Sequence, residues 1–249
     1  MIRKMKLFFI IFAVASFLLL LLFSPSPAAP IVFFGEDLGL GEATPLATYP
    51  NADTAQTNFL SQLVGVGTED FEGFATFTGA PLSLVFPGAG TATLQGGQYV
   101  YTVTPGTTNG VGRYAISGSN YWETDSSLFN IVFTDPVAAF GFYGIDLGDF
   151  LGQVTITYEN GVAQTFDIPH TVGAPGGSVI YYGFIDQANP FTQITFGNTG
   201  STEDYFGFDD MTIGSVAQVR VPEPFTTTML LLAGGYIGLL GFNRRRNRP

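Results

Sequence analysis

Cysteine is absent from this sequence of 249 residues, and lysine is absent between Lys6 and the C-terminus. The missing thiols exclude a disulfide framework, a zinc site with cysteine ligands and a cysteine nucleophile. The missing lysines exclude Schiff-base chemistry and a Walker-type phosphate loop from the body of the chain. The single histidine, His170, follows Pro169 at the end of a predicted strand. No nucleophile elbow accompanies it, so we expect a surface loop residue and not a catalytic base.

Basic residues are scarce as well. Nine Lys and Arg stand against twenty Asp and Glu, and seven of the nine lie at the two ends of the chain: Arg3, Lys4, Lys6, Arg244, Arg245, Arg246 and Arg248. Between Pro30 and Val221, Arg113 and Arg220 stand against nineteen acids, which gives this body a net charge of −17. Nucleic-acid binding needs clustered Lys and Arg, so we predict that the body binds no nucleic acid.

Glycine and aromatic residues are abundant, with 32 Gly and 15% Phe, Trp and Tyr. Short β-branched or aromatic runs, separated by Gly, Pro, Asn or Asp, predict eleven strands: Phe74–Thr78, Leu82–Phe86, Tyr99–Thr104, Arg113–Ser117, Leu128–Thr134, Val137–Ile145, Val154–Glu159, Val162–Ile168, Val179–Ile185, Phe191–Phe196 and Tyr205–Ile213. No long amphipathic helix interrupts them. The fold class is therefore predicted to be all-β, an antiparallel β-sandwich or jelly-roll-like body over residues 69–219.

Residues 29–68 are predicted to be an irregular leader with one short helix. The segment Ala29–Pro50 is rich in Pro, Gly and Ala and shows no sustained period. Asn51 is expected to cap a helix over Ala52–Leu63. Within that helix, apolar residues recur at spacings of three and four and form one packing stripe: Ala52, Ala55, Phe59 and Leu63.

The segment Val154–Ile168 is predicted to form a hairpin with Asn160-Gly161 at its tip. A two-residue loop would mix apolar and polar residues on each face. A three-residue loop opposes Tyr158 to Val162 and gathers the apolar residues on one face. We therefore predict the three-residue loop, with Gly161 in the left-handed conformation.

The N-terminus has the layout of a secretory signal peptide, predicted as a helix over residues 1–28. Three basic residues precede the apolar run Leu7–Phe23, and small residues place the cleavage site after Ala28. An uncleaved membrane anchor is the alternative. In both cases the body is exported, so the secretion translocon and signal peptidase are predicted partners.

The C-terminus, residues 221–249, has three parts. The tripeptide Pro222-Glu223-Pro224 is followed by the uncharged stretch Phe225–Phe242 and then by Arg244, Arg245 and Arg246. A helix over 225–242 would be about 27 Å long, close to the hydrocarbon thickness of a bilayer. The arginines would remain cytoplasmic. This pattern predicts a transmembrane helix with the body outside.

In order and position these three parts resemble the PEP-CTERM sorting signal of Gram-negative bacteria. The resemblance implies that the chain crosses the inner membrane, is anchored transiently, and is processed near Pro222-Glu223-Pro224 by the membrane protease-transpeptidase exosortase. The product would then reach the cell surface or the extracellular polymer matrix. A plain C-terminal anchor is the alternative. The body also looks like the β-sandwich domains that often precede such tails, on the segments Glu69–Phe74, Ala139–Phe142 and Phe206–Asp210.

Acidic residues near the first and last predicted strands suggest a metal site. Sandwich domains often bring these two strands together, which would place Glu72 near Asp209 and Asp210. Several hard oxygen ligands in one place are what Ca²⁺ requires, so these three residues are candidate ligands of a structural calcium ion. Solvated surface acids are the alternative.

A candidate sugar-binding loop contains Tyr121 and Trp122, within Ser119–Thr124. Their rings could stack on sugar faces while the polar neighbours bind hydroxyls. Packing at one end of the sandwich is the alternative.

Three functions compete: a non-enzymatic surface or matrix protein, a carbohydrate-binding module for exopolysaccharide, and a secreted hydrolase. A hydrolase of glycosides needs two facing carboxylates, and no motif stands at catalytic spacing. We therefore predict a non-enzymatic exported protein with no catalytic residues. An exposed aromatic platform would favour the carbohydrate-binding alternative.

Overall fold

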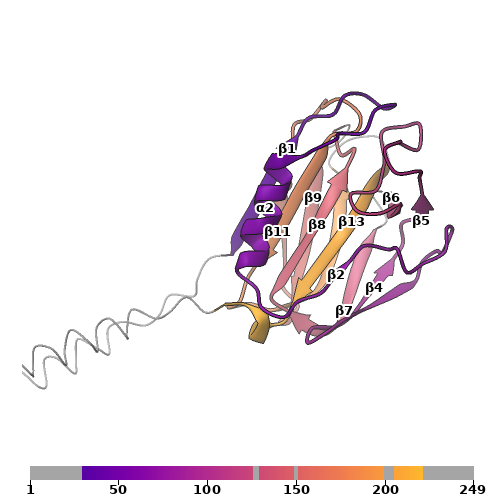
Figure 1. Cartoon of the computed structure of the whole chain (residues 1–249). Helices are drawn as coiled ribbons and strands as arrows, with labels where there is room; N and C mark the ends of the chain where they lie inside the picture. The colour runs from indigo at the N-terminus through magenta and orange to yellow at the C-terminus, as the bar shows by residue number, and fades with distance from the viewer. Residues whose placement is uncertain (1–29, 126–128, 149–150, 199–204, 221–249) are drawn as a thin grey trace, which may run out of the picture.

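The computed structural model describes residues 30–125, 129–148, 151–198 and 205–220. Ala28, the Pro222-Glu223-Pro224 motif, the stretch 225–242 and Arg244–Arg246 lie outside these residues. Two antiparallel sheets pack face to face (Figure 1), which confirms the predicted β-sandwich body. Within the described ranges, no helix combines the length and apolar character needed to cross a membrane.

The first sheet has seven strands. Six follow one another in the order β1 (Ile31–Asp37), β11 (Val179–Ile185), β8 (Ala139–Ile145), β13 (Tyr205–Gly214), β6 (Asn120–Asp125) and β5 (Tyr99–Thr102). The seventh, β2 (Thr68–Glu69), pairs with the second half of β13. Strands β1 and β5 are therefore the two opposite edges of this sheet.

The second sheet has six strands in the order β10 (Ala163–Asp167), β9 (Gly152–Tyr158), β12 (Phe191–Asn198), β7 (Asn130–Val137), β4 (Gly90–Gln95) and β3 (Leu82–Phe86). Outside the sheets lie helix α2 (Pro50–Ser61) and a short 3₁₀ turn, η1 (Val216–Gln218).

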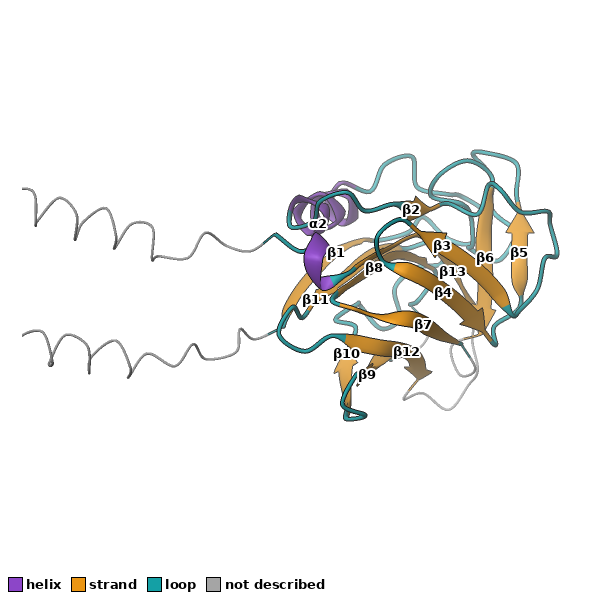
Figure 2. Cartoon of the chain, turned by 90° about the horizontal axis from the view of Figure 1, so that it is seen from below, coloured by secondary structure: helices purple, strands orange, loops and turns teal. Residues whose placement is uncertain are grey.

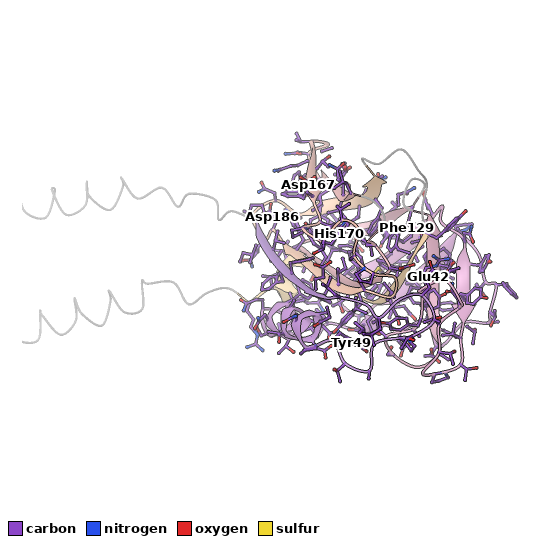
Figure 3. The ribbon with its side chains drawn as sticks, turned by 90° about the horizontal axis from the view of Figure 1, so that it is seen from above. Glu42, Tyr49, Phe129, Asp167, His170 and Asp186 are labelled. Carbon is purple, nitrogen blue, oxygen red and sulfur yellow. The ribbon has the colours of Figure 1, made fainter. Side chains whose placement is uncertain are left out.

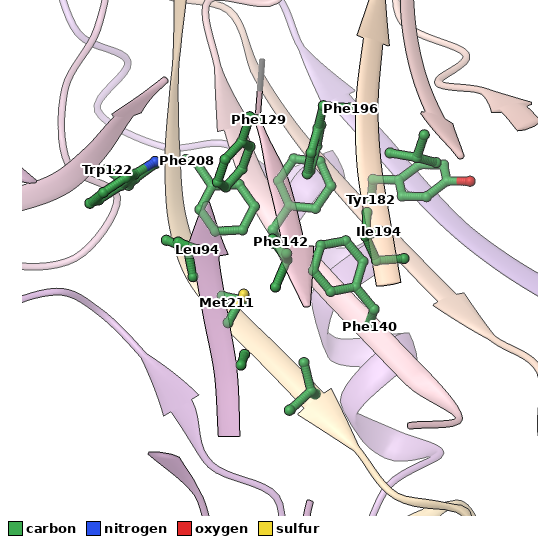
Figure 4. Packing of buried hydrophobic residues seen from close by; sticks show 14 of the residues in the cluster. Leu94, Trp122, Phe129, Phe140, Phe142, Tyr182, Ile194, Phe196, Phe208 and Met211 are labelled. Atoms are coloured by element: carbon green, nitrogen blue, oxygen red, sulfur yellow. The ribbon is translucent and has the colours of Figure 1, made fainter. Parts of the chain in front are cut away.

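Aromatic side chains fill the space between the two sheets (Figure 4). Phe142 and Phe208 of the first sheet stack with ring centroids 4.9 Å apart, and Phe129, just before β7, stacks at 4.8 Å on Phe196 of the neighbouring strand β12 in the second sheet. The alternation of strand side chains sends every second residue into this layer, as in β9, where buried and half-buried residues alternate. Burying rings of this size supplies most of the driving force for folding.

The first sheet is also covered on its outer face, by helix α2 and the loops beside it. Strands β8 and β11 are buried at every residue, as expected for strands covered on both sides. The apolar stripe of α2 faces them, and Phe59 is fully buried. Gly141 and Gly183 are opposite each other in the β8–β11 pair. A Cβ at either glycine would come within 3.0 Å of the Phe59 ring, so the two glycines form the seat for that ring.

The leader assigned to Ala29–Pro50 was wrong for its first part, because residues 31–37 form strand β1. Its Phe33, Phe34 and Gly35 pair with Gly183, Tyr182 and Tyr181. The expected cap was also wrong, since α2 begins at Pro50 and Asn51 lies inside it. The cap comes from Asp37 of β1, whose carboxylate accepts hydrogen bonds from the backbone N–H groups of Asn51 and Ala52 at 3.0 and 2.9 Å. Carboxylates are well suited to this position.

Two predicted strands, Phe74–Thr78 and Arg113–Ser117, are turns and loops in the structure. Phe77 has a φ of 68°, a left-handed conformation that a strand does not contain. The backbone N–H groups of Ile116 and Ser117 bond to a side chain, as described below, and not to a neighbouring strand. Four strands were missed: β1, β2, β4 and β6.

The predicted hairpin is confirmed. Val154 is opposite Phe166 in the β9–β10 pair, and the Tyr158 N–H donates to the Val162 carbonyl at 2.8 Å. Gly161 has a φ of 80°, the left-handed conformation that the three-residue loop requires.

Replacing Gly183 tests the seat of Phe59. The new Cβ of Gly183→Ala would lie 2.7 Å from the Phe59 ring, so we expect the free energy of unfolding to fall by about 1–3 kcal/mol. Gly197→Ala is the matched control on β12, because its Cβ would meet its nearest neighbour at 3.7 Å, and its effect should stay within about 0.5 kcal/mol. Denaturant unfolding of both variants measures the difference. Equal effects would show that Phe59 does not need the glycine seat.

Candidate binding surface

The predicted sugar-binding loop is a strand, and its two aromatic residues are inside the protein. Tyr121 and Trp122 lie in β6 and are both 0% exposed. The Trp122 ring stacks on Phe129 in the layer between the sheets (Figure 4). The same ring also stacks on that of Phe71. A ring without solvent exposure cannot stack on a sugar, so this prediction was wrong and the packing alternative is correct. The polar neighbours that suggested a loop lie in β6 itself, where they pair with residues of β5 and β13.

The start of the predicted body does meet its last strand, since Glu69 of β2 is opposite Met211 of β13, although the first predicted strand, Phe74–Thr78, is not a strand. The three predicted calcium ligands nevertheless do not converge. Glu72 accepts hydrogen bonds from the N–H groups of Ser119 and Asn120 at 2.7 and 2.5 Å. Asp209 accepts from Ile116 N–H at 2.8 Å, and Asp210 accepts from the Ser117 hydroxyl at 2.7 Å.

These carboxylates hold one segment, residues 116–120, which leads into β6. A bulge in β13 makes this possible, because Asp210 has a φ of 48° and the register with β8 shifts there. Asp209 is 0% exposed. Burial raises its pKa well above the usual range, as does the neighbouring Asp210, while the backbone N–H groups of Asp210, Ile116 and Ser117 act in the opposite direction. Among the described residues, no three acidic or histidine side chains form a group that could hold a metal ion.

Arg113 is buried in a cluster of charged and aromatic groups. Its guanidinium lies 3.0 Å from Glu123 and 3.5 Å from Asp146. It also donates to the Tyr205 carbonyl at 3.3 Å and lies 5.9 Å from the centre of the Tyr205 ring. Ion pairs of this kind, shielded from water, cost much more to break than exposed ones. The cluster ties the 109–113 loop to β6 and to the start of β13.

His170 is buried, which contradicts the predicted surface position (Figure 3). Its Nε2 accepts a hydrogen bond from the Gly152 N–H at 3.0 Å, so this nitrogen carries no proton. Burial lowers the pKa of the ring below its ordinary 6.5. The histidine therefore fastens the segment after β10 to the start of β9.

Exposed aromatic rings gather at the β5 edge of the first sheet. Tyr99 and Tyr101 are two residues apart on the outer face of β5 and half-buried, with ring centroids 6.2 Å apart. Phe77 packs edge-on against Tyr99 at 5.1 Å and is 68% exposed. We call these three residues the aromatic platform. Thr102 and Asn120 lie on the opposite face of β5 and β6 from these rings, where the Thr102 hydroxyl donates to Asn120 Oδ1 at 2.7 Å and Asn120 is buried.

The backbone holds Phe77 in this position at a cost. The Phe77 N–H donates to the Val100 carbonyl at 2.8 Å and the Val100 N–H donates to the Thr78 carbonyl at 2.9 Å. These bonds cover the β5 edge and force the left-handed φ of 68° on a phenylalanine, where glycine or asparagine would be less strained. Backbone strain of this kind concentrates at functional sites. The alternating tyrosines of β5 were a sequence signal for this surface, but the position of Phe77 over them was not.

A groove adjoins the platform on the same face of the first sheet. It has a volume of about 440 Å³ and lies between residues 44–49 and the loops at 103–107 and 114–118. Tyr49, which precedes α2 (Figure 3), and Tyr114 supply aromatic walls. The hydroxyl of Tyr49 donates to the Ile116 carbonyl at 3.0 Å, and that of Tyr114 donates to the Gly177 carbonyl at 2.9 Å. No Asp, Glu or His lines the groove in the described chain.

No family model and no curated protein matches the sequence. Two solved structures are similar in shape. One is the K2 cleaved adhesin domain of Lys-gingipain, at 16% identity and a TM-score of 0.31 over 59% of this chain and 97% of that one. The other is the CBM22-1 xylan-binding domain of Xyn10C from Paenibacillus barcinonensis, at 14% identity and a TM-score of 0.35 over 63% of this chain and 96% of that one. Both likenesses are weak, so function has to be inferred from the residues of this chain.

The buried His170 makes stability depend on pH. Because burial lowers its pKa in the folded protein, the unfolded chain takes up a proton at higher pH than the folded chain. Its contribution to stability is present above pH 6.5 and is lost as the pH falls through the lowered pKa. We expect the melting temperature to fall between about pH 7 and about pH 5.

His170→Gln is the variant that isolates this effect. Its amide oxygen can accept the Gly152 N–H but does not titrate, so its melting temperature should fall less over the same pH range. Glu36 lies near the ring and partly offsets the effect of burial in the wild type. The raised pKa of Asp209 has the opposite influence on the pH dependence and is common to both proteins. Parallel melting curves for the two proteins would show that His170 does not control this pH dependence.

Proposed function

We propose that this chain is an exported, non-catalytic surface protein whose β-sandwich binds polysaccharide through the aromatic platform. The observation that carries the proposal is the exposed Phe77, held in a strained backbone conformation over Tyr99 and Tyr101. Aromatic rings offer flat apolar faces with little conformational entropy to lose on binding. Such faces suit the CH-rich faces of sugar rings, while the hydroxyls of Tyr99 and Tyr101 can bond to sugar hydroxyls.

The positions of the polar groups support a function in binding and not in catalysis. Asp209, Asp210 and Glu72 use their oxygens to hold the 116–120 segment. Arg113 is engaged by ion pairs, and His170 is buried away from the platform. General acid–base catalysis most often uses His, Asp or Glu within reach of the substrate, and none of these three residue types belongs to the platform or to the described lining of the groove.

The arrangement of the chain ends fits a surface protein. The two ends of the described chain lie at the side of β1 and α2, and β5 lies at the opposite side (Figure 2). Arg220, the last described residue, bonds to the Gln62 carbonyl just beyond α2. We propose that the predicted signal peptide and the PEP-CTERM-like tail direct export and processing by exosortase. An anchor at either end would then leave the platform directed away from the membrane.

Removing platform rings should weaken binding to polysaccharide without unfolding the protein. We expect Phe77→Ala and Tyr101→Ala each to lower the affinity by about three- to tenfold, the equivalent of one aromatic contact. Val85→Ala is the matched control, because Val85 is 77% exposed on β3 of the other sheet. Affinity electrophoresis in gels containing polysaccharide from the producing cells measures all three. Retention that is the same for platform and control variants would overturn the proposed site.

Phe77→Asn separates binding from folding. Asparagine tolerates the left-handed conformation better than alanine, so this variant should melt at a higher temperature than Phe77→Ala. Both variants lack the ring and should bind equally weakly. If binding instead followed melting temperature across the two variants, Phe77 would serve stability and not ligand binding.

The export proposal predicts the mass of the mature protein. We expect cleavage after Ala28 and removal of the segment after Pro224, so the product should lack both terminal apolar stretches. Intact-mass analysis of the protein recovered from the cell surface decides this. A product that retains Phe225–Pro249 would be an ordinary anchored protein and would exclude exosortase processing.

A further inference from the structure

The charges of the body narrow the class of ligand that the aromatic platform can accept. This step rests on the proposed function. Arg113 and Arg220 are the permanent cations between residues 30 and 220. Arg113 is buried and paired with Glu123 and Asp146. Arg220 lies at the opposite side of the domain from β5, where its side chain donates to the Leu63 carbonyl. No permanent cation among the described residues can therefore meet an anionic ligand at the platform.

The net charge of the body also disfavours anionic ligands. A body with a charge of −17 repels polyanions at long range. The polar side-chain groups of the platform and of the groove include the hydroxyls of Tyr99, Tyr101, Thr44 and Thr107. Glu123, opposite Tyr99 in the β5–β6 pair, is buried and paired with Arg113. The nearby Glu72 uses its oxygens on the 119–120 segment. Neutral hydroxyl groups are the ligand chemistry that these side chains can satisfy without leaving a charge unpaired.

The groove extends the platform along the direction of β5. Tyr99 and Tyr101 stand on the outer face of this strand, and Val103, the residue after its end, lines the groove. The Val103 N–H donates to the Ser119 carbonyl at 2.9 Å, which fixes the strand end against the groove. From Tyr99 to Val103 the chain advances about 13 Å. This is longer than one sugar ring, so a ligand in contact with both regions must have several units.

We infer that the platform and the groove are adjoining subsites for an internal segment of an uncharged polysaccharide. The platform stacks on successive sugar rings, and the groove takes the units that follow, between Tyr49 and Tyr114. The groove volume of about 440 Å³ falls within the range of small-molecule sites. The ligand class is thus a neutral glycan chain, and an acidic polymer binds only weakly.

Graded oligosaccharides test the two subsites. The probes are neutral gluco-, manno- and xylo-oligosaccharides from disaccharide to hexasaccharide, together with alginate oligosaccharides as the anionic series, titrated calorimetrically against the purified protein. We expect at least one neutral series to bind, with affinity rising at least about tenfold from the shortest to the longest member. The alginate series should bind at least about tenfold more weakly at equal length, with no divalent cation present.

Filling the groove separates this inference from the proposed function. Ala47 is exposed and lines the groove, whereas Ala43 is exposed four residues earlier and does not line it. Ala47→Trp should reduce the affinity for the hexasaccharide about to that of the disaccharide and leave the disaccharide affinity unchanged. Ala43→Trp, the matched control, should change neither. Phe77→Ala should weaken binding of both lengths.

The outcomes distinguish a failure of the two-subsite inference from a failure of the proposed function. If Phe77→Ala weakens binding but Ala47→Trp does not, and affinity does not rise with length, the platform is still the binding site but the two-subsite inference fails. Equal binding of alginate and of a neutral series overturns the charge selection. If no neutral series binds, the inference fails. If a series binds and Phe77→Ala leaves its affinity unchanged, the proposed function itself fails.

Discussion

The burial of β8 and β11 on both faces is the constraint on which the rest of this structure depends. One face meets the aromatic layer between the sheets and the other meets α2 and its loops. A strand in that position needs large apolar residues on the side that faces the second sheet. On the other side it needs a very small residue wherever an aromatic ring of the helix approaches. Gly141 and Gly183 meet the second requirement under Phe59. The helix is then fixed over the sheet, and Asp37 of β1 caps its first turn.

Hydrogen bonds to carboxylates connect the central strands of the first sheet to its β5 edge. The bulge in β13 turns Asp209 toward the 116–120 segment, and Glu72 holds the other end of that segment. This segment leads directly into β6, which in turn pairs with β5. The positions of Tyr99 and Tyr101 thus depend on acids that lie in different parts of the chain. An acidic composition here serves internal hydrogen bonding as well as surface charge.

The sequence predicted the elements whose pattern is local. Val179–Ile185 and Leu82–Phe86 form strands with the predicted bounds, and the Val154–Ile168 hairpin has the predicted register. The apolar stripe of the helix was also predicted, because its period is local. β1 was missed because Pro and Gly surround it and because its partner, β11, lies about 150 residues later in the chain. Phe74–Thr78 has strand composition, but its hydrogen bonds to β5 require a left-handed residue.

Composition and short-range periodicity were sufficient to predict the β-sandwich class, the charge of the body and the lack of cysteine and lysine chemistry. Which aromatic rings face solvent was decided by the tertiary structure. Trp122 and Tyr99 are both aromatic residues with polar neighbours in the sequence. In the structure, Trp122 is enclosed between the sheets and Tyr99 lies on an edge strand. The same holds for the acids, because a carboxylate becomes a metal ligand or a backbone acceptor according to which groups the fold brings to it. The pairing of segments that are far apart in the sequence sets the surroundings of each side chain, and a local sequence pattern does not predict that pairing.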